Sequence, residues 1–115
     1  MPTFQRGDVV KVPFPYADRA TRQRRPAVVI SGADLAHRHG LLWVMMITSA
    51  ENRHRDGDLV IASLAAAGLS APSVIRTTKI ATLDARDAER IGKVKGLLLS
   101  EAVALVRRQI EDGAD

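Results

Sequence analysis

Three short apolar runs, separated by turn-forming and charged segments, are the feature of this sequence that most constrains its fold. Residues 9–12 (VVKV) end at Pro13, residues 27–31 (AVVIS) follow Pro26, and residues 41–47 read LLWVMMI. Short runs rich in β-branched residues predict strands, and proline limits a strand because it lacks the backbone N–H that a ladder needs. The second and third runs are apolar at nearly every position, which predicts strands buried in the middle of a sheet.

Weaker strand patterns follow along the chain. Residues 59–61 and 90–94 each predict a short strand, and residues 73–76 and 79–83 predict either two strands or one bent strand. Residues 64–68 (LAAAG) predict a helical turn that Gly68 stops. The segments between the strands are expected to be loops.

The last segment differs, because apolar residues recur there at helical spacing. Leu99, Val103, Val106 and Ile110 lie at positions i, i+4, i+7 and i+11, which places them on one face of a helix of about four turns. We expect that face to pack against the rest of the domain. About six short strands and one C-terminal amphipathic helix predict a mainly β fold, a small and partly open barrel.

Composition limits the class of protein. With 115 residues, 46% of them hydrophobic and 26% charged, the chain predicts one globular domain over residues 1–115. No apolar run reaches the length of a membrane span and no leader pattern follows Met1, so we expect a cytoplasmic protein with no membrane partner. The sequence contains no cysteine, which excludes a disulfide framework, a thiolate zinc site and a cysteine nucleophile.

The charge balance favours a polyanionic partner. The formal net charge is +4, and 13 of the 17 cationic residues are arginines, whose planar fork suits phosphate groups. The codon usage of a GC-rich genome also produces an arginine excess, and composition leaves both explanations open. The four aromatic residues are too few for a broad base-stacking platform.

Metal chemistry has little support in the sequence. His37 and His39 would share one face of an extended segment, but the His-x-x-x-His spacing of a helical metal site is absent and His54 stands alone, so we predict no metal and no cofactor. A phosphate-binding glycine loop and a Gly-x-Ser-x-Gly motif are also absent from the sequence. What remains is a set of cations and hydroxyls near strand ends, each of which fits an ordinary surface role when taken singly: Arg24, Arg25, Thr48, Ser49, Arg76, Thr77 and Thr78.

The order of these residues along the chain resembles the MazF/PemK (Kid) toxin family. Residues 6–10 (RGDVV) resemble the family's first strand and residues 25–31 (RPAVVIS) its second. Residues 44–49 (VMMITS) resemble the strand that ends in two hydroxyl residues, and residues 73–84 (SVIRTTKIATLD) resemble the fifth and sixth strands. The resemblance extends over nearly the whole chain, from residue 6 to residue 111.

The resemblance implies an SH3-like barrel of the CcdB/PemK-like type with a C-terminal helix, assembled as a homodimer. It implies a toxin of a type II toxin–antitoxin system that a cognate antitoxin restrains. Such a toxin is an endoribonuclease, or mRNA interferase, that cuts single-stranded RNA at short motifs without a metal. The ribose 2′-OH attacks the adjacent phosphate, which leaves 2′,3′-cyclic phosphate and 5′-OH ends. A nucleophile supplied by the substrate removes the need for a cysteine or an activated serine.

Matched residue by residue, the family pattern implies catalytic roles for Arg25, Thr48 and Arg76. Thr48 would hydrogen-bond the scissile phosphate, and the two arginines would stabilise the charge of the phosphorane. Because the pKa of arginine lies above about 12, charge stabilisation is favoured over proton transfer by these side chains. Ser49 and Thr78 would contact substrate, and Asp8 is a candidate substrate-site residue that orients an arginine.

The polar segment 15–24 carries three further arginines, Arg19, Arg22 and Arg24. We expect this segment to be a loop that grips the RNA backbone through phosphate contacts. A solvated surface loop is the alternative.

The chain also departs from the family pattern. Plasmid-type members have an aspartate as general base where this chain has Thr78, and a histidine in the first loop, which residues 15–24 lack. His54 or Asp18 could substitute, or the reaction could depend on Arg25 and Thr48 as in the chromosomal branch. The alternatives to a ribonuclease are a CcdB-like gyrase poison, against which the aromatic-free tail counts, and a non-catalytic nucleic-acid-binding barrel.

Overall fold

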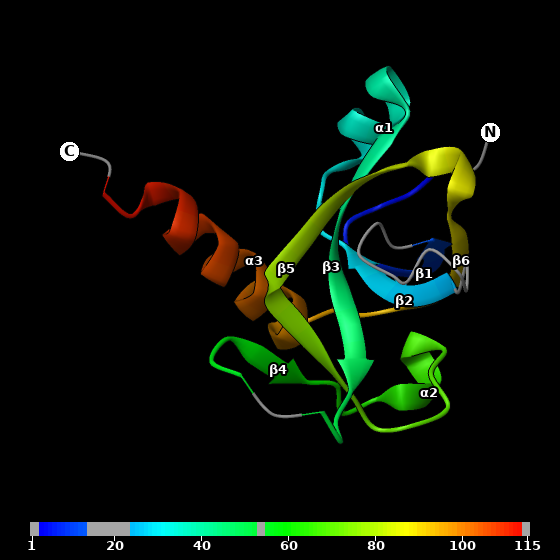
Figure 1. The fold of residues 1–115 in the computed structure, drawn as a ribbon. Coiled ribbons are helices and arrows are strands. Elements are labelled where there is room, and N and C mark those ends of the chain that lie inside the picture. The colour runs from blue at the N-terminus through cyan, green and yellow to red at the C-terminus, as the bar shows by residue number, and fades with distance from the viewer. Residues whose placement is uncertain (1–2, 14–23, 53–54, 114–115) are drawn as a thin grey trace.

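The computed structural model describes residues 3–13, 24–52 and 55–113. These residues form a six-stranded sheet with three α-helices around it (Figure 1). The strands are β1 (Asp8–Pro13), β2 (Arg24–Val29), β3 (Leu41–Ser49), β4 (Asp58–Val60), β5 (Ser73–Asp84) and β6 (Glu89–Lys93). The helices are α1 (Ala33–His39), α2 (Leu64–Ala67) and α3 (Leu97–Glu111), and a 3-10 turn, η1, spans Ala85–Asp87.

The strands follow the order β4-β5-β3-β2-β1-β6, and every neighbouring pair is antiparallel. The sheet coils strongly but does not close, since β4 and β6 remain its two edges. The prediction of a mainly β fold, a partly open barrel with a C-terminal helix, is confirmed. The apolar runs at 27–31 and 41–47 give β2 and β3, which occupy the middle of the sheet as expected.

Both faces of the sheet are covered by apolar side chains. Face A carries a core that includes Val10, Ala27, Val44 and Met46, together with Phe4 from the N-terminal segment. Face B carries a second core that includes Val9, Val28, Met45, Ile47 and Ile75, against which α2 and α3 as far as Val106 pack. Burial on both faces explains why the central strands are apolar at consecutive positions instead of alternating.

The segment that was expected to be two strands or one bent strand is a single strand, β5. Met45 pairs with Ile80, but the next residue, Met46, pairs with Arg76, so the register shifts between them. The extra residues on β5 form a bulge, which bends the strand and increases its twist. Residues 73–76 therefore continue the ladder with β3 beyond the bend and reach β4 on their other side.

One helix was not expected from the sequence. The segment between β2 and β3 forms α1. Because none of its residues is buried, the sequence has no apolar stripe from which this helix could be predicted. Ala36 packs against the core of face A, Asp34 in the first turn pairs with Arg38 at 3.2 Å on the surface, and Gly40 ends the helix with a φ of 68°. The helical turn expected over residues 64–68 is confirmed as α2, which ends at Ala67 with Gly68 as its cap.

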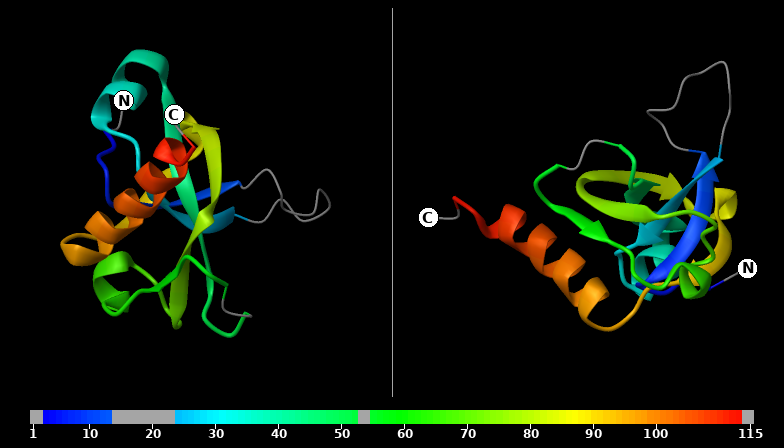
Figure 2. Two further views of the ribbon diagram at one scale, coloured as in Figure 1. Left: turned by 90° about the vertical axis from the view of Figure 1, so that its left-hand side faces the viewer. Right: turned by 90° about the horizontal axis from the view of Figure 1, so that it is seen from below.

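The C-terminal helix α3 forms where expected, but its packing differs from the prediction. Leu98, Leu99 and Val106 contact the core of face B, and Ala102 is fully buried. Ile110, predicted to pack, is 72% exposed, and Leu97 is 82% exposed. The reason is geometric, because α3 projects away from the sheet and its last turns have no part of the described chain beside them (Figure 2). None of the described helices is long and apolar enough to cross a membrane.

Candidate active site

The ends of β2 and β3 bring Arg25 and Thr48 together on face A. Ala27 pairs with Met46 in the antiparallel ladder. In this register the residue two positions before Ala27, Arg25, lies beside the residue two positions after Met46, Thr48. Side chains two residues apart on a strand share a face, and both pairing residues belong to the core of face A. Residues 23 positions apart in the sequence thus become neighbours through strand register.

A shallow pocket of about 300 Å³ opens at these strand ends. Arg25 is its one charged side chain among the described residues, and its polar groups come from Thr48, Ser49, Asn52 and Ser73. No carboxylate or imidazole lines the described part of the pocket, so a bound anion meets attraction without local repulsion. The structure therefore brings together three of the residues that the sequence pattern selected, Arg25, Thr48 and Ser49.

A tight turn follows β3 and fixes the polar groups of the pocket. Asn52 donates its backbone N–H to the Ser49 carbonyl oxygen at 3.1 Å, and Glu51 donates its backbone N–H to Ser49 Oγ at 3.2 Å. Ala50 donates its backbone N–H to the Pro72 carbonyl oxygen at 2.9 Å, which holds the turn against the opposite wall. The Asn52 side-chain amide folds back and donates to Thr48 Oγ1.

The two adjacent arginines at the start of β2 point to opposite faces and have different partners. Arg24 contacts Glu89 Oε1 at 3.3 Å and donates to the backbone carbonyl of Asp87 at 2.7 Å, so it ties β2 to the segment around η1 and β6. The structure places Arg24 outside the pocket, apart from Arg25. Arg25 is half-buried and makes no ion pair with any residue that the structure describes. Within the part of the chain that the structure describes, Arg24 therefore has an acidic partner in Glu89, whereas Arg25 has none.

Arg76 lies on the same face as Arg25 but does not line the pocket. It pairs with Met46 in the ladder, which makes it a diagonal neighbour of Thr48 across β3 and β5. Its guanidinium binds Asp58 at two points, Nε to Oδ1 at 3.1 Å and Nη2 to Oδ2 at 2.9 Å, and both side chains are almost fully buried. The hydrogen bonds to Asp58 raise the pKa of Arg76 above its ordinary value, so this arginine remains a cation.

Asp8, which was expected to orient an arginine, is buried and pairs with Arg90. Its Oδ2 accepts from Arg90 Nη2 at 2.9 Å and from the Gln5 backbone N–H at 2.9 Å, and Lys93 Nζ lies 3.9 Å from Oδ1. These residues line a separate hollow of about 570 Å³ beside β6. Asp8 therefore supports the junction of β1 and β6 and contacts neither Arg25 nor Arg76 through any described ion pair.

The other predicted site residues fall outside this cluster. Thr78 is exposed in the bulge of β5, two residues beyond Arg76. Arg19 and Arg22, and the alternative bases Asp18 and His54, lie outside the described residues.

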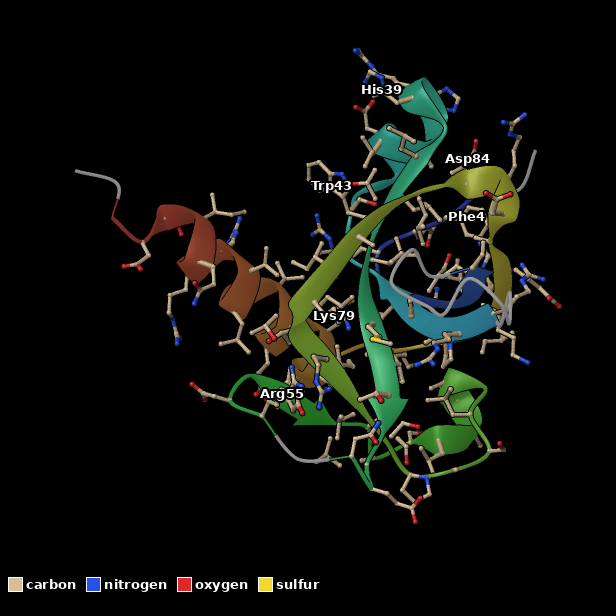
Figure 3. All side chains as sticks on the ribbon, in the orientation of Figure 1. Phe4, His39, Trp43, Arg55, Lys79 and Asp84 are labelled. Atoms are coloured by element: carbon tan, nitrogen blue, oxygen red, sulfur yellow. The ribbon has the colours of Figure 1, made fainter. Side chains whose placement is uncertain are left out.

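The described histidines lie far from the pocket. His39 is at the tip of α1, at the opposite end of the molecule from Arg55 beside β4 (Figure 3). No group of three His, Cys, Asp or Glu side chains that could hold a metal ion occurs among the described residues.

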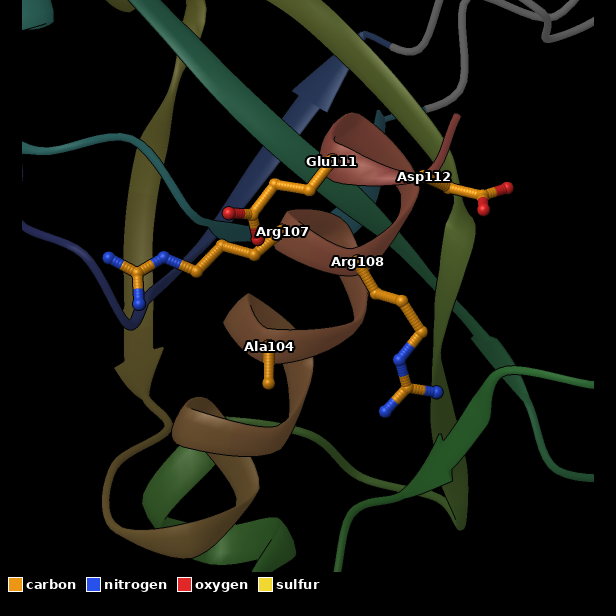
Figure 4. Close-up of a pocket in the computed structure, with 5 residues that line it drawn as sticks. All are labelled: Ala104, Arg107, Arg108, Glu111 and Asp112. Atoms are coloured by element: carbon orange, nitrogen blue, oxygen red, sulfur yellow. The ribbon is translucent and has the colours of Figure 1, made fainter. Parts of the chain in front are cut away.

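A larger hollow of about 510 Å³ lies along the exposed part of α3 (Figure 4). Arg107 and Arg108 extend on two sides of the helix, with Glu111 and Asp112 in the next turn. Two cations and two acids give this hollow no net charge, so it has no preference for an anion. The smaller pocket at Arg25 is the better candidate for binding phosphate.

Sequence reasoning missed two residues of this region, Asn52 and Asp58. Both belong to the stretch 51–58 (ENRHRDGD), whose charges are typical of a solvated loop. Asp58 is nevertheless 7% exposed because it begins β4, directly opposite Arg76 in the ladder. The sequence did contain one signal for Asp58, because a carboxylate at the start of one predicted strand can pair with an arginine on another predicted strand. Asn52 had no comparable signal.

The chain is similar to a known protein family and to several solved structures. Residues 5–112 match the family described as PemK-like, MazF-like toxin of type II toxin–antitoxin system. Similar solved structures include MazF from Deinococcus radiodurans, with a TM-score of 0.76 and 22% identity over 96% of this chain and 98% of that chain. A MazE–MazF complex from the same organism has a TM-score of 0.74 and 24% identity over 96% and 97%.

A further similar structure is an endoribonuclease in complex with its cognate antitoxin from mycobacterial species, with a TM-score of 0.68 and 15% identity over 90% and 94% of the two chains. At these identities the solved structures show a shared fold. No curated protein sequence matches the chain significantly. The family match, by contrast, spans nearly the entire chain, and on this ground the chain belongs to the PemK-like, MazF-like toxin family of type II toxin–antitoxin systems.

Proposed function

We propose that this protein is the toxin of a type II toxin–antitoxin system and a metal-independent endoribonuclease that cleaves single-stranded messenger RNA at short motifs. Toxins of the MazF/PemK family are endoribonucleases, which supports the reaction class. The observation that carries the proposal for this chain is the pocket in which Arg25 and Thr48 meet. It offers one cation that has no ion-pair partner among the described residues, and several hydroxyl and amide groups at a strand end, with no acidic side chain in its described lining.

The reaction proposed for this pocket is an internal transfer of the phosphodiester. The 2′-oxygen forms a bond to phosphorus while the bond from phosphorus to the 5′-oxygen breaks. The 2′-OH loses its proton and the leaving 5′-oxygen gains one, so the products are a 2′,3′-cyclic phosphate and a 5′-OH. Negative charge grows on the non-bridging oxygens in the transition state, where preorganised donors have their greatest effect.

Each side chain of the pocket has a function that its chemistry allows. Arg25 binds a non-bridging oxygen through its fork and neutralises the developing charge, because a guanidinium does not lose its proton at physiological pH. Thr48 donates its hydroxyl hydrogen to the same phosphate, and Ser49 contacts the adjacent nucleotide. The described part of the pocket contains no titratable base, so proton removal falls to water or to a side chain outside the described residues, such as Asp18 or His54.

Arg76 supports the same reaction from the neighbouring strand β5, outside the pocket. A guanidinium keeps its proton at physiological pH and is a poor proton donor, and the hydrogen bonds to Asp58 raise the pKa of Arg76 further. We assign it a contribution to the electrostatic potential on face A, not a direct contact with the leaving group. This assignment is narrower than the catalytic role that the family pattern implies.

The proposed partners are single-stranded RNA, a cognate antitoxin and a second copy of this chain. The antitoxin is supported by the family and by similar structures solved as toxin–antitoxin complexes. The homodimer is supported by the exposed apolar residues of α3, Leu97 and Ile110, which no described segment covers. Because the proposed substrate is messenger RNA, the proposed location is the cytoplasm.

The test is incubation of the purified chain with end-labelled single-stranded RNA in EDTA. We expect cleavage at discrete positions, with cyclic phosphate and 5′-OH ends identified by mass spectrometry. A matched RNA with a 2′-deoxy nucleotide at the cleavage position should remain intact, because it lacks the nucleophile. If the wild-type protein leaves every RNA in a pool of varied sequences intact, the ribonuclease proposal is refuted. The protein would then be a nucleic-acid-binding barrel without ribonuclease activity.

A further inference from the structure

The structure assigns Asn52 as a positioning residue for the Thr48 hydroxyl, an inference that rests on the function proposed above. Asn52 lines the same pocket as Arg25 and Thr48, and its side-chain nitrogen donates a hydrogen bond to Thr48 Oγ1. The residue is exposed, so its amide does not contribute a buried contact to the core. Its one described side-chain partner is the hydroxyl that is proposed to bind the scissile phosphate.

The turn that holds Asn52 does not depend on its side chain. The turn is closed by the backbone N–H of Asn52 on the Ser49 carbonyl and is held to the next segment by Ala50 on the Pro72 carbonyl. Glu51 contributes its backbone N–H to Ser49 Oγ. Replacing the Asn52 side chain therefore leaves these bonds in place, and an effect on the reaction can be separated from an effect on folding.

The chemistry of a threonine hydroxyl explains what the amide does. The hydroxyl has one hydrogen to donate and two lone pairs to accept with. When Asn52 occupies one lone pair, the hydrogen of Thr48 must point away from that amide, and Thr48, Asn52 and Arg25 all line the same pocket. The hydroxyl is then oriented to donate to a phosphate oxygen. It is also a stronger donor, because hydrogen bonds in a chain polarise one another.

A neutral amide suits this position better than a charged side chain. A carboxylate would accept the Thr48 hydrogen and withdraw it from the phosphate, and its negative charge would repel the substrate. A cation would donate to Thr48 but would compete with Arg25 for the phosphate. Asparagine donates without adding charge, so the phosphate remains bound between Arg25 and Thr48.

The experiment measures two quantities for each variant: the single-turnover cleavage rate constant, and the affinity for an RNA made non-cleavable by a 2′-deoxy nucleotide. We expect Asn52→Ala to reduce the rate constant about three- to tenfold and the affinity about twofold, the scale of one neutral hydrogen bond. Asn52→Asp should reduce both more strongly. The matched control is Gln109→Ala, which removes an exposed amide from α3 and should behave as wild type.

A double-mutant cycle with Thr48→Val distinguishes positioning from any other role. Valine keeps the shape of threonine and removes the hydroxyl, so Asn52→Ala should have no further effect in that background. Thermal midpoints of Asn52→Ala and wild type should agree. Equal losses from Asn52→Ala in both backgrounds, or an Asn52→Ala variant identical to Gln109→Ala, would overturn the inference. A wild-type protein that binds the 2′-deoxy RNA but cleaves no RNA would refute only the ribonuclease proposal. The same double-mutant cycle, measured on the affinity for the 2′-deoxy RNA, would then still decide whether Asn52 acts through Thr48.

Discussion

Arg76 and Asp58 face each other on neighbouring strands and bind at two points, with 3.1 Å from Nε to Oδ1 and 2.9 Å from Nη2 to Oδ2. The side chain of Asp58 is fully buried and that of Arg76 is 9% exposed. Asp58 Oδ2 also accepts the backbone N–H of Arg55 at 3.0 Å. The pair therefore joins the edge strand β4 to β5 and fixes a cation on face A, diagonal to Thr48.

Removal of one member of this pair should strongly destabilise the protein. Asp58→Ala leaves the guanidinium of Arg76 buried beside an empty space, and we expect a loss of roughly 3 kcal/mol in the free energy of unfolding, the lower end for broken buried pairs. Urea denaturation measures this loss. The matched control is the exposed neighbour Asp56→Ala, which should change stability by less than about 0.5 kcal/mol. Equal stability of the two variants would contradict a structural role for the pair.

Replacement of both members by apolar residues separates stability from function. We expect Asp58→Leu combined with Arg76→Met to recover most of the stability lost in the single variant, because no uncompensated charge remains buried. Cleavage of RNA by the double variant should fall only about threefold, because Arg76 and Asp58 together carry no net charge and only the position of Arg76 on the strand next to β3 favours the anion. Wild-type cleavage by a stable double variant would remove Arg76 from the mechanism.

The arginines of segment 15–24 should govern how RNA affinity depends on salt. We expect Arg19→Ala with Arg22→Ala to weaken the binding of all RNA sequences alike, because phosphate contacts carry no sequence information. Loss of two phosphate contacts should reduce the slope of log affinity against log salt by about 1.4. Fluorescence anisotropy at several salt concentrations measures the slope. An unchanged slope would mean that these arginines do not contact the RNA backbone.

The exposed end of α3 should support dimerisation. Ile110 is 72% exposed on the apolar side of the helix, and Ile110→Lys places a charge where a second copy would pack. We expect wild type to sediment as a dimer and Ile110→Lys to shift toward monomer. Gln109→Lys adds the same charge at the adjacent position and should remain dimeric. A wild type that is monomeric at every concentration would exclude this surface as a dimer interface.

The strands could be predicted because their apolar runs are short, β-branched and bounded by proline or glycine. The helix α1 could not, because none of its residues is buried and the partly buried Ala36 that packs against the core makes no apolar stripe in the sequence. The spacing of Leu99, Val103, Val106 and Ile110 predicted α3 correctly. The spacing did not predict that the end of the helix extends past the sheet. Periodicity identifies the apolar face of a helix but not the part of the protein that packs against that face.

The candidate site was predictable only in part. Arg25 and Thr48 were selected by resemblance to a family, but their proximity depends on the register in which Ala27 pairs with Met46. Asp8 was expected to orient an arginine, and in the fold this arginine is Arg90, which is 82 residues away in sequence and does not line the pocket of Arg25 and Thr48. Asn52 and Asp58 lie in a polar stretch typical of solvated loops, and only the three-dimensional arrangement distinguishes them from their neighbours.

The central claim is that Arg25 and Thr48 together bind and stabilise the phosphate that is cleaved. The most direct measurement is the single-turnover rate of RNA cleavage in EDTA by Arg25→Ala and Thr48→Val, with Arg24→Ala as the control for loss of an adjacent arginine outside the pocket. We predict losses of at least about a hundredfold for Arg25→Ala and about tenfold for Thr48→Val, the scale for removing donors that stabilise a transition state, whereas Arg24→Ala retains most of the wild-type rate. Cleavage by Arg25→Ala at the rate of Arg24→Ala would contradict the account.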